Sequence, residues 1–360
     1  MRPAAPRALL TLAVVLVAGV AGFPSGKVTD LFSRDGRMRG ACFVAGGPIG
    51  QAAFAPLLEN NVEWISQTPF GYASTLDSPR IDLATRGDIY WGETDEGIAE
   101  TARLAKKFGI RTLLKPHVWI GGWHEAAWSG EIRMKTEADW KRWFDSYLAF
   151  LLHYAELAEK HRIEALAVGT ELQGTTLGHE KEWRALIARV RRVYSGRLTY
   201  TANWDHEFEG LPFWDALDFA GVQAYFPLTD RARPSMLELL AGWRPHVEML
   251  ERVAGRIRRP IVFTEVGYKS SERASIQPWL WRTEDPVDLE EQARCYEAMF
   301  RSVWGKLWFR GTFIWKWFPL YDRTRSASDN NFTPQGKPAE QVLGRWYRQT
   351  DLPARPHAPL

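Results

Sequence analysis

The sequence predicts a single-domain α/β fold, a closed (β/α)8 barrel of the TIM type. Eight short apolar runs alternate along the chain with longer amphipathic stretches, and eight is the number of strands that such a barrel needs. Several of these runs are apolar at nearly every position, as is typical of parallel strands covered on both faces. We expect the barrel domain to span residues 23–350, preceded by a leader at 1–22 and followed by a C-terminal tail at 351–360.

The expected strands and helices alternate in order along the chain. The strands are Ala41–Ala45, Val62–Gln67, Thr112–His117, Ala165–Gly169, Leu198–Asn203, Phe219–Ala224, Ile261–Thr264 and Thr312–Trp315. The helices show apolar residues at helical spacing and are Ala52–Asn60, Asp95–Phe108, Glu137–Lys160, Lys181–Tyr194, Met236–Ala254, Leu289–Trp304 and Ala339–Tyr347. After the fifth strand only a short stretch around Leu211–Ala216 is available for a helix.

An open doubly wound sheet is the alternative fold. It would need a glycine-rich phosphate loop with G-x-G-x-x-G spacing after its first strand. The segment Gly46–Gly50 reads Gly-Gly-Pro-Ile-Gly, so it lacks this spacing and we interpret it as an ordinary loop.

The first 22 residues have the pattern of a secretory signal peptide. Arg2 and Arg7 precede an uncharged apolar run, Ala8–Ala21, that ends in small residues. This run is shorter than the roughly 20 apolar residues of a membrane-spanning helix, so we expect cleavage near Gly22 rather than a retained anchor. The protein is therefore expected to be secreted or periplasmic, with no membrane attachment after cleavage.

Composition narrows the class of protein further. Removal of the leader with its two arginines lowers the 46 Lys and Arg to 44, against 43 Asp and Glu, so the mature chain is nearly neutral and has no electrostatic reason to bind nucleic acid. Two cysteines, Cys42 and Cys295, form no disulfide framework, and we favour two buried free thiols. The 18 Trp would suit a sugar-binding groove, because indole faces cover pyranose rings.

Two glutamates directly follow apolar strands at the end of the barrel where functional residues gather. Glu171 follows the fourth strand and Glu265 follows the seventh, and these strands lie across the barrel mouth from one another. Hydrolysis of a glycosidic bond needs one protonated and one ionised carboxyl group on the two sides of that bond. A structural ion pair is the alternative for either residue alone, but two such glutamates among aromatic strand ends favour a glycosidase.

The segments around these strand ends resemble glycoside hydrolase family 113. They are Leu114–His117, Val168–Glu171, Thr199–Asp205, Ala224–Leu228 and Phe263–Tyr268, and the resemblance extends from about Gly40 to Tyr347. The family belongs to a large clan of retaining barrel glycosidases, and its known activity is endo-β-1,4-mannanase. The resemblance implies that Glu171 is the acid/base and Glu265 the nucleophile. It also implies that Tyr225 lies near the nucleophile and that Trp315 forms the floor of the sugar site.

The chain departs from the clan's pattern at three places. Most of the clan has Asn just before the acid/base, whereas this chain has Thr170, whose hydroxyl is shorter and carries no amide donor. Asn203 on the adjacent strand is a candidate to take over part of that role. The Arg that many members carry on strand two is absent, and Lys316 stands where an acid or amide is expected, which leaves the identity of the sugar open.

Other polar and aromatic residues near the strand ends are candidates for sugar binding. The expected substrate-binding residues are His117, Trp119, Asn203, Trp204, Tyr225 and Trp315. His117 is also consistent with a hydrogen-bonded barrel histidine. Tryptophans in the loops after strands three and seven are equally consistent with a groove wall or with packing, namely Trp123, Trp128, Trp279 and Trp281. Asp329–Asn331 either lines the groove or forms a turn. His124-Glu125 has no second His at helical spacing, so no metal site is expected.

Together these features predict a monomeric, secreted, retaining β-glycoside hydrolase that uses no metal or other cofactor. The expected substrate is β-1,4-mannan or manno-oligosaccharide, cleaved by double displacement. Another β-linked glycan, such as a glucan or galactan, is the nearest alternative substrate. A carbohydrate-binding barrel without catalysis is the alternative class of protein.

Overall fold

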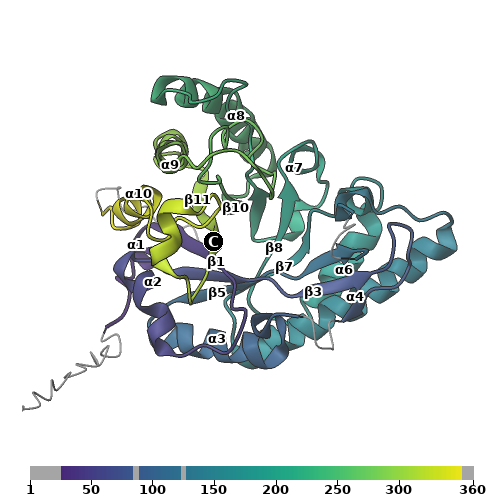
Figure 1. Ribbon diagram of the computed structural model, residues 1–360. Helices are drawn as coiled ribbons and strands as arrows, with labels where there is room; N and C mark the ends of the chain where they lie inside the picture. The colour runs from purple at the N-terminus through teal and green to yellow at the C-terminus, as the bar shows by residue number, and fades with distance from the viewer. Residues whose placement is uncertain (1–25, 84–88, 123–126, 351–360) are drawn as a thin grey trace, which may run out of the picture.

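The computed structural model describes residues 26–83, 89–122 and 127–350, and its centre is a closed barrel of eight parallel strands (Figure 1). Around the barrel the strands are β1 (Met38–Phe43), β2 (Trp64–Gln67), β5 (Arg111–Leu114), β7 (Ala165–Thr170), β8 (Arg197–Asn203), β9 (Phe219–Gln223), β10 (Ile261–Val266) and β11 (Phe309–Trp317). Strand β11 pairs with β1 and so closes the ring. The predicted (β/α)8 fold class is confirmed.

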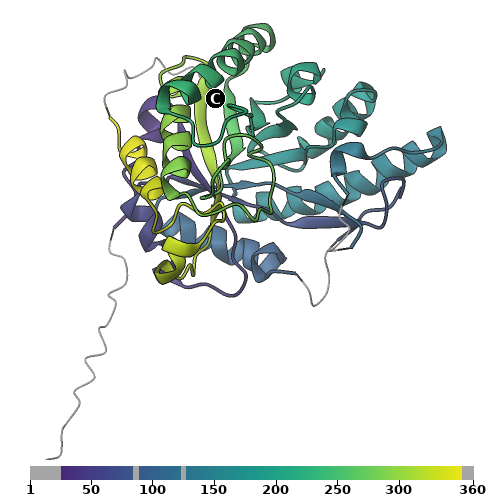
Figure 2. The same ribbon diagram turned by 45° about the horizontal axis from the view of Figure 1, so that its top comes forward.

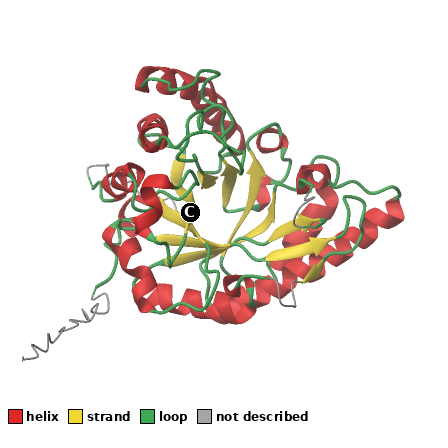
Figure 3. Cartoon of the chain, viewed as in Figure 1, coloured by secondary structure: helices red, strands yellow, loops and turns green. Residues whose placement is uncertain are grey.

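Helices surround the strands in both ribbon views and in the view coloured by secondary structure (Figures 2 and 3). The longer helices are α2 (Ala55–Glu59), α3 (Asp95–Lys107), α4 (Glu137–His161), α6 (Glu180–Val190), α8 (Met236–Ile257), α9 (Leu289–Val303) and α10 (Pro338–Tyr347). Side chains that accept a backbone N–H explain where several of them begin, and these caps are Thr94, Thr136, Ser235 and Asp288.

Shorter helical segments occupy the loops. They are α1 (Phe32–Asp35), α5 (Gln173–Thr176), α7 (Glu207–Gly210) and the 3-10 turns η1 (Gln51–Phe54), η2 (Trp91–Glu93), η3 (Ser129–Glu131), η4 (Trp214–Ala216) and η5 (Arg323–Ser328). The helical segments after β8 are short, as expected. Within the predicted stretch Leu211–Ala216, only Trp214–Ala216 is helical. The signal-peptide region 1–22 and the tail 351–360 lie outside the described residues.

The barrel interior has its own apolar cluster, separate from the layer between strands and helices. It is formed by Phe32, Met38, Cys42, Trp64, Leu113, Ala165, Phe219, Val262 and Phe313. Trp315 packs against this cluster and is half-buried at the mouth. A Cβ on Gly40 would lie 2.5 Å from the Phe313 ring, so a glycine is needed there to admit the ring. Cys42 in β1 and Cys295 in α9 are buried free thiols, which confirms that expectation.

A second, three-stranded sheet extends one side of the barrel mouth, and the sequence did not predict it. It contains β3 (Phe70–Ala73), β6 (His117–Ile120) and β4 (Asp82–Leu83), with β3 and β6 parallel. The third barrel strand was expected to run to His117, but it ends at Leu114. Pro116 has no N–H to continue the ladder, and Pro69 occupies the equivalent gap between β2 and β3.

The extra sheet rests on helix α4. A Cβ on Gly71 would lie 2.6 Å from the ring of Phe150 in that helix, so the two backbones approach closely. The hydroxyl of Ser146, also in α4, accepts the N–H of Ile81 at 2.9 Å. No helix in the described ranges has the length and hydropathy needed to span a membrane.

Candidate active site

Glu171 directly follows β7 and has an unusual backbone conformation. Its φ is 49°, in the left-handed region that residues other than glycine seldom occupy. Its N–H still donates to the Thr201 carbonyl oxygen at 3.0 Å, so the residue stays tied to strand β8. Strained backbone of this kind concentrates at functional sites.

Glu265, near the end of β10, is buried among donors. Its Oε1 accepts the Lys115 ammonium as an ion pair, and its Oε2 accepts the Tyr225 hydroxyl at 2.8 Å. Burial opposes ionisation, but the positive charge of Lys115 and these hydrogen bonds outweigh it, so the pKa of Glu265 is lowered. The carboxyl group is therefore ionised at neutral pH.

Glu171 lies in the opposite electrostatic situation. Desolvation is the largest effect and the charge of Glu265 is the second, and together they raise the pKa of Glu171 to about 7. The amide Nδ2 of Asn203 donates to Glu171 Oε1 at 2.7 Å, and a hydrogen bond from Trp128 also favours the ionised form without reversing the shift. The two carboxyl groups at the mouth therefore differ in protonation.

A second buried carboxyl group, Glu207, fixes the turn that carries Asn203. Its Oε2 accepts the Asn203 N–H at 2.7 Å, while its Oε1 accepts the hydroxyls of Tyr200 at 2.6 Å and Thr176 at 2.9 Å. Burial raises the pKa of Glu207 to about 7 in spite of these donors. Glu207 was not predicted from the sequence, because its position relative to other residues does not distinguish it from an exposed acidic residue of a short helix.

Thr170 does not replace the amide that most of the clan has before the acid/base. Its buried hydroxyl donates to the Pro116 carbonyl oxygen at 3.3 Å and accepts from the Thr201 hydroxyl at 2.8 Å. The amide at the mouth instead comes from Asn203, which contacts Glu171 directly.

Lys115 is the other residue to which the sequence analysis gave no role. It follows β5, is fully buried, and its ammonium also donates to the Thr264 carbonyl oxygen at 3.4 Å. One feature of the sequence could have indicated the role of Lys115. It is a charged residue directly after an apolar strand, in a chain that lacks the arginine many clan members carry on strand two.

His117 lies beside Glu265, and Trp315 lies near Lys115, the lysine that pairs with Glu265. His117 Nε2 is 3.8 Å from Glu265 Oε1, and burial, followed by the charge of Lys115, lowers the pKa of His117 to about 3. The imidazole is therefore neutral at physiological pH. The Trp315 ring centroid lies 5.7 Å from the Lys115 ammonium nitrogen.

Several of the other predicted aromatic residues pack against further aromatic rings. Trp119 in β6 meets Phe70 edge-on at 5.8 Å between ring centroids. Trp204 stacks on Trp279 at 5.4 Å, and Trp281 is 62% exposed. Trp123 and His124-Glu125 lie outside the described residues.

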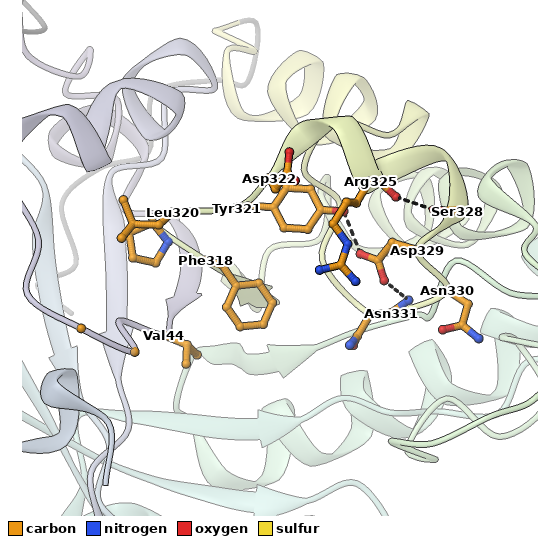
Figure 4. Close-up of a pocket in the computed structure, with 13 residues that line it drawn as sticks. Val44, Phe318, Leu320, Tyr321, Asp322, Arg325, Ser328, Asp329, Asn330 and Asn331 are labelled. Carbon is orange, nitrogen blue, oxygen red and sulfur yellow. Dashed lines mark hydrogen bonds between the residues drawn. The ribbon is translucent and has the colours of Figure 1, made fainter. Parts of the chain in front are cut away.

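A cavity of about 580 Å³ opens beside the mouth, between the loops after β1 and β11 (Figure 4). Its lining includes Phe318, Tyr321, Arg325 and the segment Asp329–Asn331. Asp329 accepts the Tyr321 hydroxyl at 2.8 Å and the Asn331 N–H at 2.9 Å. The segment is therefore a turn that also lines this cavity.

Comparisons with known proteins agree with this geometry. The family model for Glycoside Hydrolase Family 113 matches residues 47–337. Comparison with curated protein sequences gives no match. The GH113 β-mannanase AaManA from Alicyclobacillus acidocaldarius, solved in complex with ManMIm, is 33% identical, with a TM-score of 0.75 over 86% of this chain and 97% of that one. A structure described as a complex of a GH113 β-1,4-mannanase is 26% identical, with a TM-score of 0.76 over 87% of this chain and 99% of that one.

A more distant structure shares only the fold. The β-glucuronidase from Ruminococcus gnavus is 14% identical, with a TM-score of 0.57 over 87% of this chain and 50% of that one. The family model, in contrast, spans most of the sequence and includes both mouth glutamates. The chain therefore belongs to glycoside hydrolase family 113 and is a glycoside hydrolase.

Proposed function

We propose that the protein is a retaining endo-β-1,4-mannanase in which Glu171 is the acid/base and Glu265 the nucleophile. The observation that carries this proposal is the contrast between two glutamates at one barrel mouth. Glu265 is held by Lys115 and Tyr225, whereas Glu171 accepts the Asn203 amide, and the pKa values of the two carboxyl groups are shifted in opposite directions. A double displacement needs such a pair, with one carboxyl group that holds a proton and one that does not.

In the first step, ionised Glu265 attacks the anomeric carbon while Glu171 protonates the leaving oxygen, and a glycosyl-enzyme ester forms. Esterification removes the charge of Glu265, which is the second-largest cause of the raised pKa of Glu171. The pKa of Glu171 therefore falls in the intermediate, and the residue becomes a better base. In the second step it removes a proton from water, which attacks the anomeric carbon and releases Glu265 and a product of retained configuration.

The residues around the glutamates have supporting roles in this proposal. Tyr225 and Lys115 hold the nucleophile through its two oxygens, and the amide of Asn203 orients Glu171. Trp315 forms the floor beneath the reacting sugar. The neutral imidazole of His117 offers its Nε2, which has no hydrogen-bond partner among the described residues, to a sugar hydroxyl. Trp119 and Trp204 contact sugars further along the groove.

The mannan substrate is supported by the names of the similar structures, which are β-mannanases. Another β-linked glycan is the alternative within the class. A barrel that binds carbohydrate without cleaving it is disfavoured, because such a protein has no need for a buried lysine that ionises one glutamate beside a second glutamate of raised pKa.

Digestion of a panel of polysaccharides tests this function. We expect β-1,4-mannan to yield a ladder of oligosaccharides, and cellulose and β-1,4-galactan to give little product. Glu265→Ala should abolish turnover, and added azide should restore part of it and yield the α-glycosyl azide. Cleavage of mannan by Glu265→Ala without azide, at more than a few per cent of the wild-type rate, would contradict the assignment.

We further propose that the chain acts as a monomer outside the cytoplasm after removal of residues 1–22. The support is the pattern of Arg2, Arg7 and the apolar run that follows them. When the full chain is expressed in a bacterium, the exported protein should begin near Gly22 or Phe23 and sediment as one chain. An exported form that keeps Met1 would reject the leader.

A further inference from the structure

Lys316 is a second cation at the floor of the proposed sugar site, and the mechanism above does not use it. Its ammonium nitrogen lies 5.3 Å from the Trp315 ring centroid and 5.2 Å from the Phe318 ring centroid. The Lys115 ammonium also lies near the Trp315 ring, so one indole has two positive charges close to it. Within residues 26–83, 89–122 and 127–350, no hydrogen bond or ion pair joins the Lys316 ammonium to another residue.

Among the residues that the structure describes, the charges nearest the proposed sugar site leave one positive charge without a matching anion. Lys115 and Glu265 neutralise one another as an ion pair. Glu171 must carry its proton to act as an acid, and His117 is neutral. The remaining charge is the positive charge of Lys316. Glu265 attracts this charge, but its carboxylate already forms an ion pair with Lys115.

The surroundings of Lys316 attract a cation but do not neutralise it. Desolvation is the largest effect on this side chain and lowers the pKa of Lys316. Aromatic faces offset part of this cost through cation–π attraction, yet they leave the net charge in place. A partly desolvated charge without a counter-ion is costly, and an anion brought by the substrate would remove that cost.

A cavity shares one lining residue with the surroundings of Lys316. Phe318, which touches the Lys316 ammonium, also lines the cavity between the loops after β1 and β11 (Figure 4). Asp329 in that cavity is occupied, because it accepts the Tyr321 hydroxyl at 2.8 Å and the Lys337 ammonium at 3.2 Å. The same lining contains the cation Arg325 and a second carboxyl group, that of Asp322.

We propose that Lys316 binds a negatively charged substituent of the reacting sugar, either a carboxylate or a sulfate ester, so that among the β-linked mannosyl glycans of the proposed function those with acidic units are the preferred substrates. The proposal rests on the proposed function in one respect, which is that the scissile bond lies between Glu171 and Glu265. A hydroxyl of a neutral sugar is the other partner that a lysine can bind, but it would leave the positive charge unbalanced.

Matched aryl glycosides test the proposal. The probes are 4-nitrophenyl β-D-mannopyranoside, its 6-sulfate and the corresponding β-D-mannopyranosiduronate. We expect one of the two acidic probes to exceed the neutral one in kcat/KM by about 10- to 100-fold, the range for a hydrogen bond to a charged group. The two acidic probes show which anion is recognised. A neutral probe that is cleaved at least as efficiently as both acidic ones would overturn the proposal.

Substitution of Lys316 locates the effect. Lys316→Gln should reduce the acidic-to-neutral ratio of kcat/KM to near one, and Lys316→Arg should keep most of the preference. Lys141→Gln, which removes an exposed lysine on α4, is the matched control and should keep the ratio. Equal losses on acidic and neutral probes in Lys316→Gln would reject recognition of an anion at this residue.

Two further measurements keep the test decisive if a variant folds poorly or turnover is slow. In the wild type, raising the ionic strength from about 0.01 M to about 0.15 M should raise KM for the acidic probe alone, since salt screens an ion pair. Calorimetry with Glu265→Ala should show tighter binding of mannuronate or sulfated trisaccharides than of mannotriose. An unchanged salt response and equal affinities would refute the inference, whereas an active Glu265→Ala would refute only the proposed mechanism.

Discussion

Lys115 and Glu265 form an ion pair across the barrel mouth although they are 150 positions apart in the chain. The lysine follows β5 and the glutamate lies in β10, so the pair exists only in the closed barrel. Both side chains are buried, and the lysine has no exposed surface. The cation therefore acts on the glutamate through a medium that screens charge far less than water does.

Replacing Lys115 by Met should shift the acidic limb of the pH–rate profile to higher pH. Loss of the positive charge leaves burial as the main influence, so the pKa of Glu265 should rise. The profile of kcat/KM from about pH 3 to pH 8 reports that pKa for the free enzyme. Lys115→Arg, which keeps the charge, should leave the limb nearly in place, and an unmoved limb in Lys115→Met would show that the ion pair does not set the ionisation.

Glu171 should control the alkaline limb of the same profile. Its pKa is raised to about 7 and the acid must be protonated, so the rate should fall as the pH rises through that value. Glu265 must be ionised and its pKa is lowered, so the rate should fall at the acidic end only below its ordinary range. Glu171→Gln has no proton to lose, and its alkaline limb should disappear. Substrates with poor leaving groups should suffer far more than aryl glycosides, and equal losses would count against an acid role.

Gly130→Ala should impair turnover through Trp128 while leaving the fold intact. An added Cβ would lie 2.4 Å from the Trp128 indole, which hydrogen-bonds Glu171. We expect kcat/KM to fall about 10- to 100-fold, because small displacements of groups that orient a catalytic residue are costly. Trp128 is 41% exposed and has space to move, so the free energy of unfolding should change by less than about 1 kcal/mol.

Gly178→Ala is the control for this experiment, because no atom lies within 4 Å of its added Cβ. It should match the wild type in rate and in stability. If Gly130→Ala retained the wild-type rate, the indole would have no part in orienting Glu171.

The first product of hydrolysis should keep the β configuration. Glu171 and Glu265 end strands on opposite sides of the mouth, and a retaining pair has its carboxyl groups about 5–5.5 Å apart. Proton NMR during the first minutes, before mutarotation, distinguishes the anomers. An initial α product would mean an inverting reaction with a water between carboxylate and sugar, even if both glutamates proved essential.

The sequence predicted the barrel well because buried parallel strands leave a strong local pattern. All eight apolar runs became barrel strands, and both glutamates lie at the mouth. The second sheet could not be predicted, because β3 and β6 are only four residues long and their partners are short segments, namely each other, β4 and a single bridge to Ala127. Asn203 and Tyr225, which contact the two glutamates, were among the expected residues. Lys115 and Glu207 were missed, since they reach their places through tertiary folding.

The second sheet has a consequence for how substrate range can change. Since β3 and β6 continue beyond the barrel and rest on α4, this side of the mouth is already ordered before a glycan arrives and loses little conformational entropy on binding. The facing side is built from the loops after β10 and β11, where a change in length costs little stability. Grafted or lengthened loops on that side should therefore alter the set of accepted glycans, while the sheet side keeps a constant frame for the sugar chain.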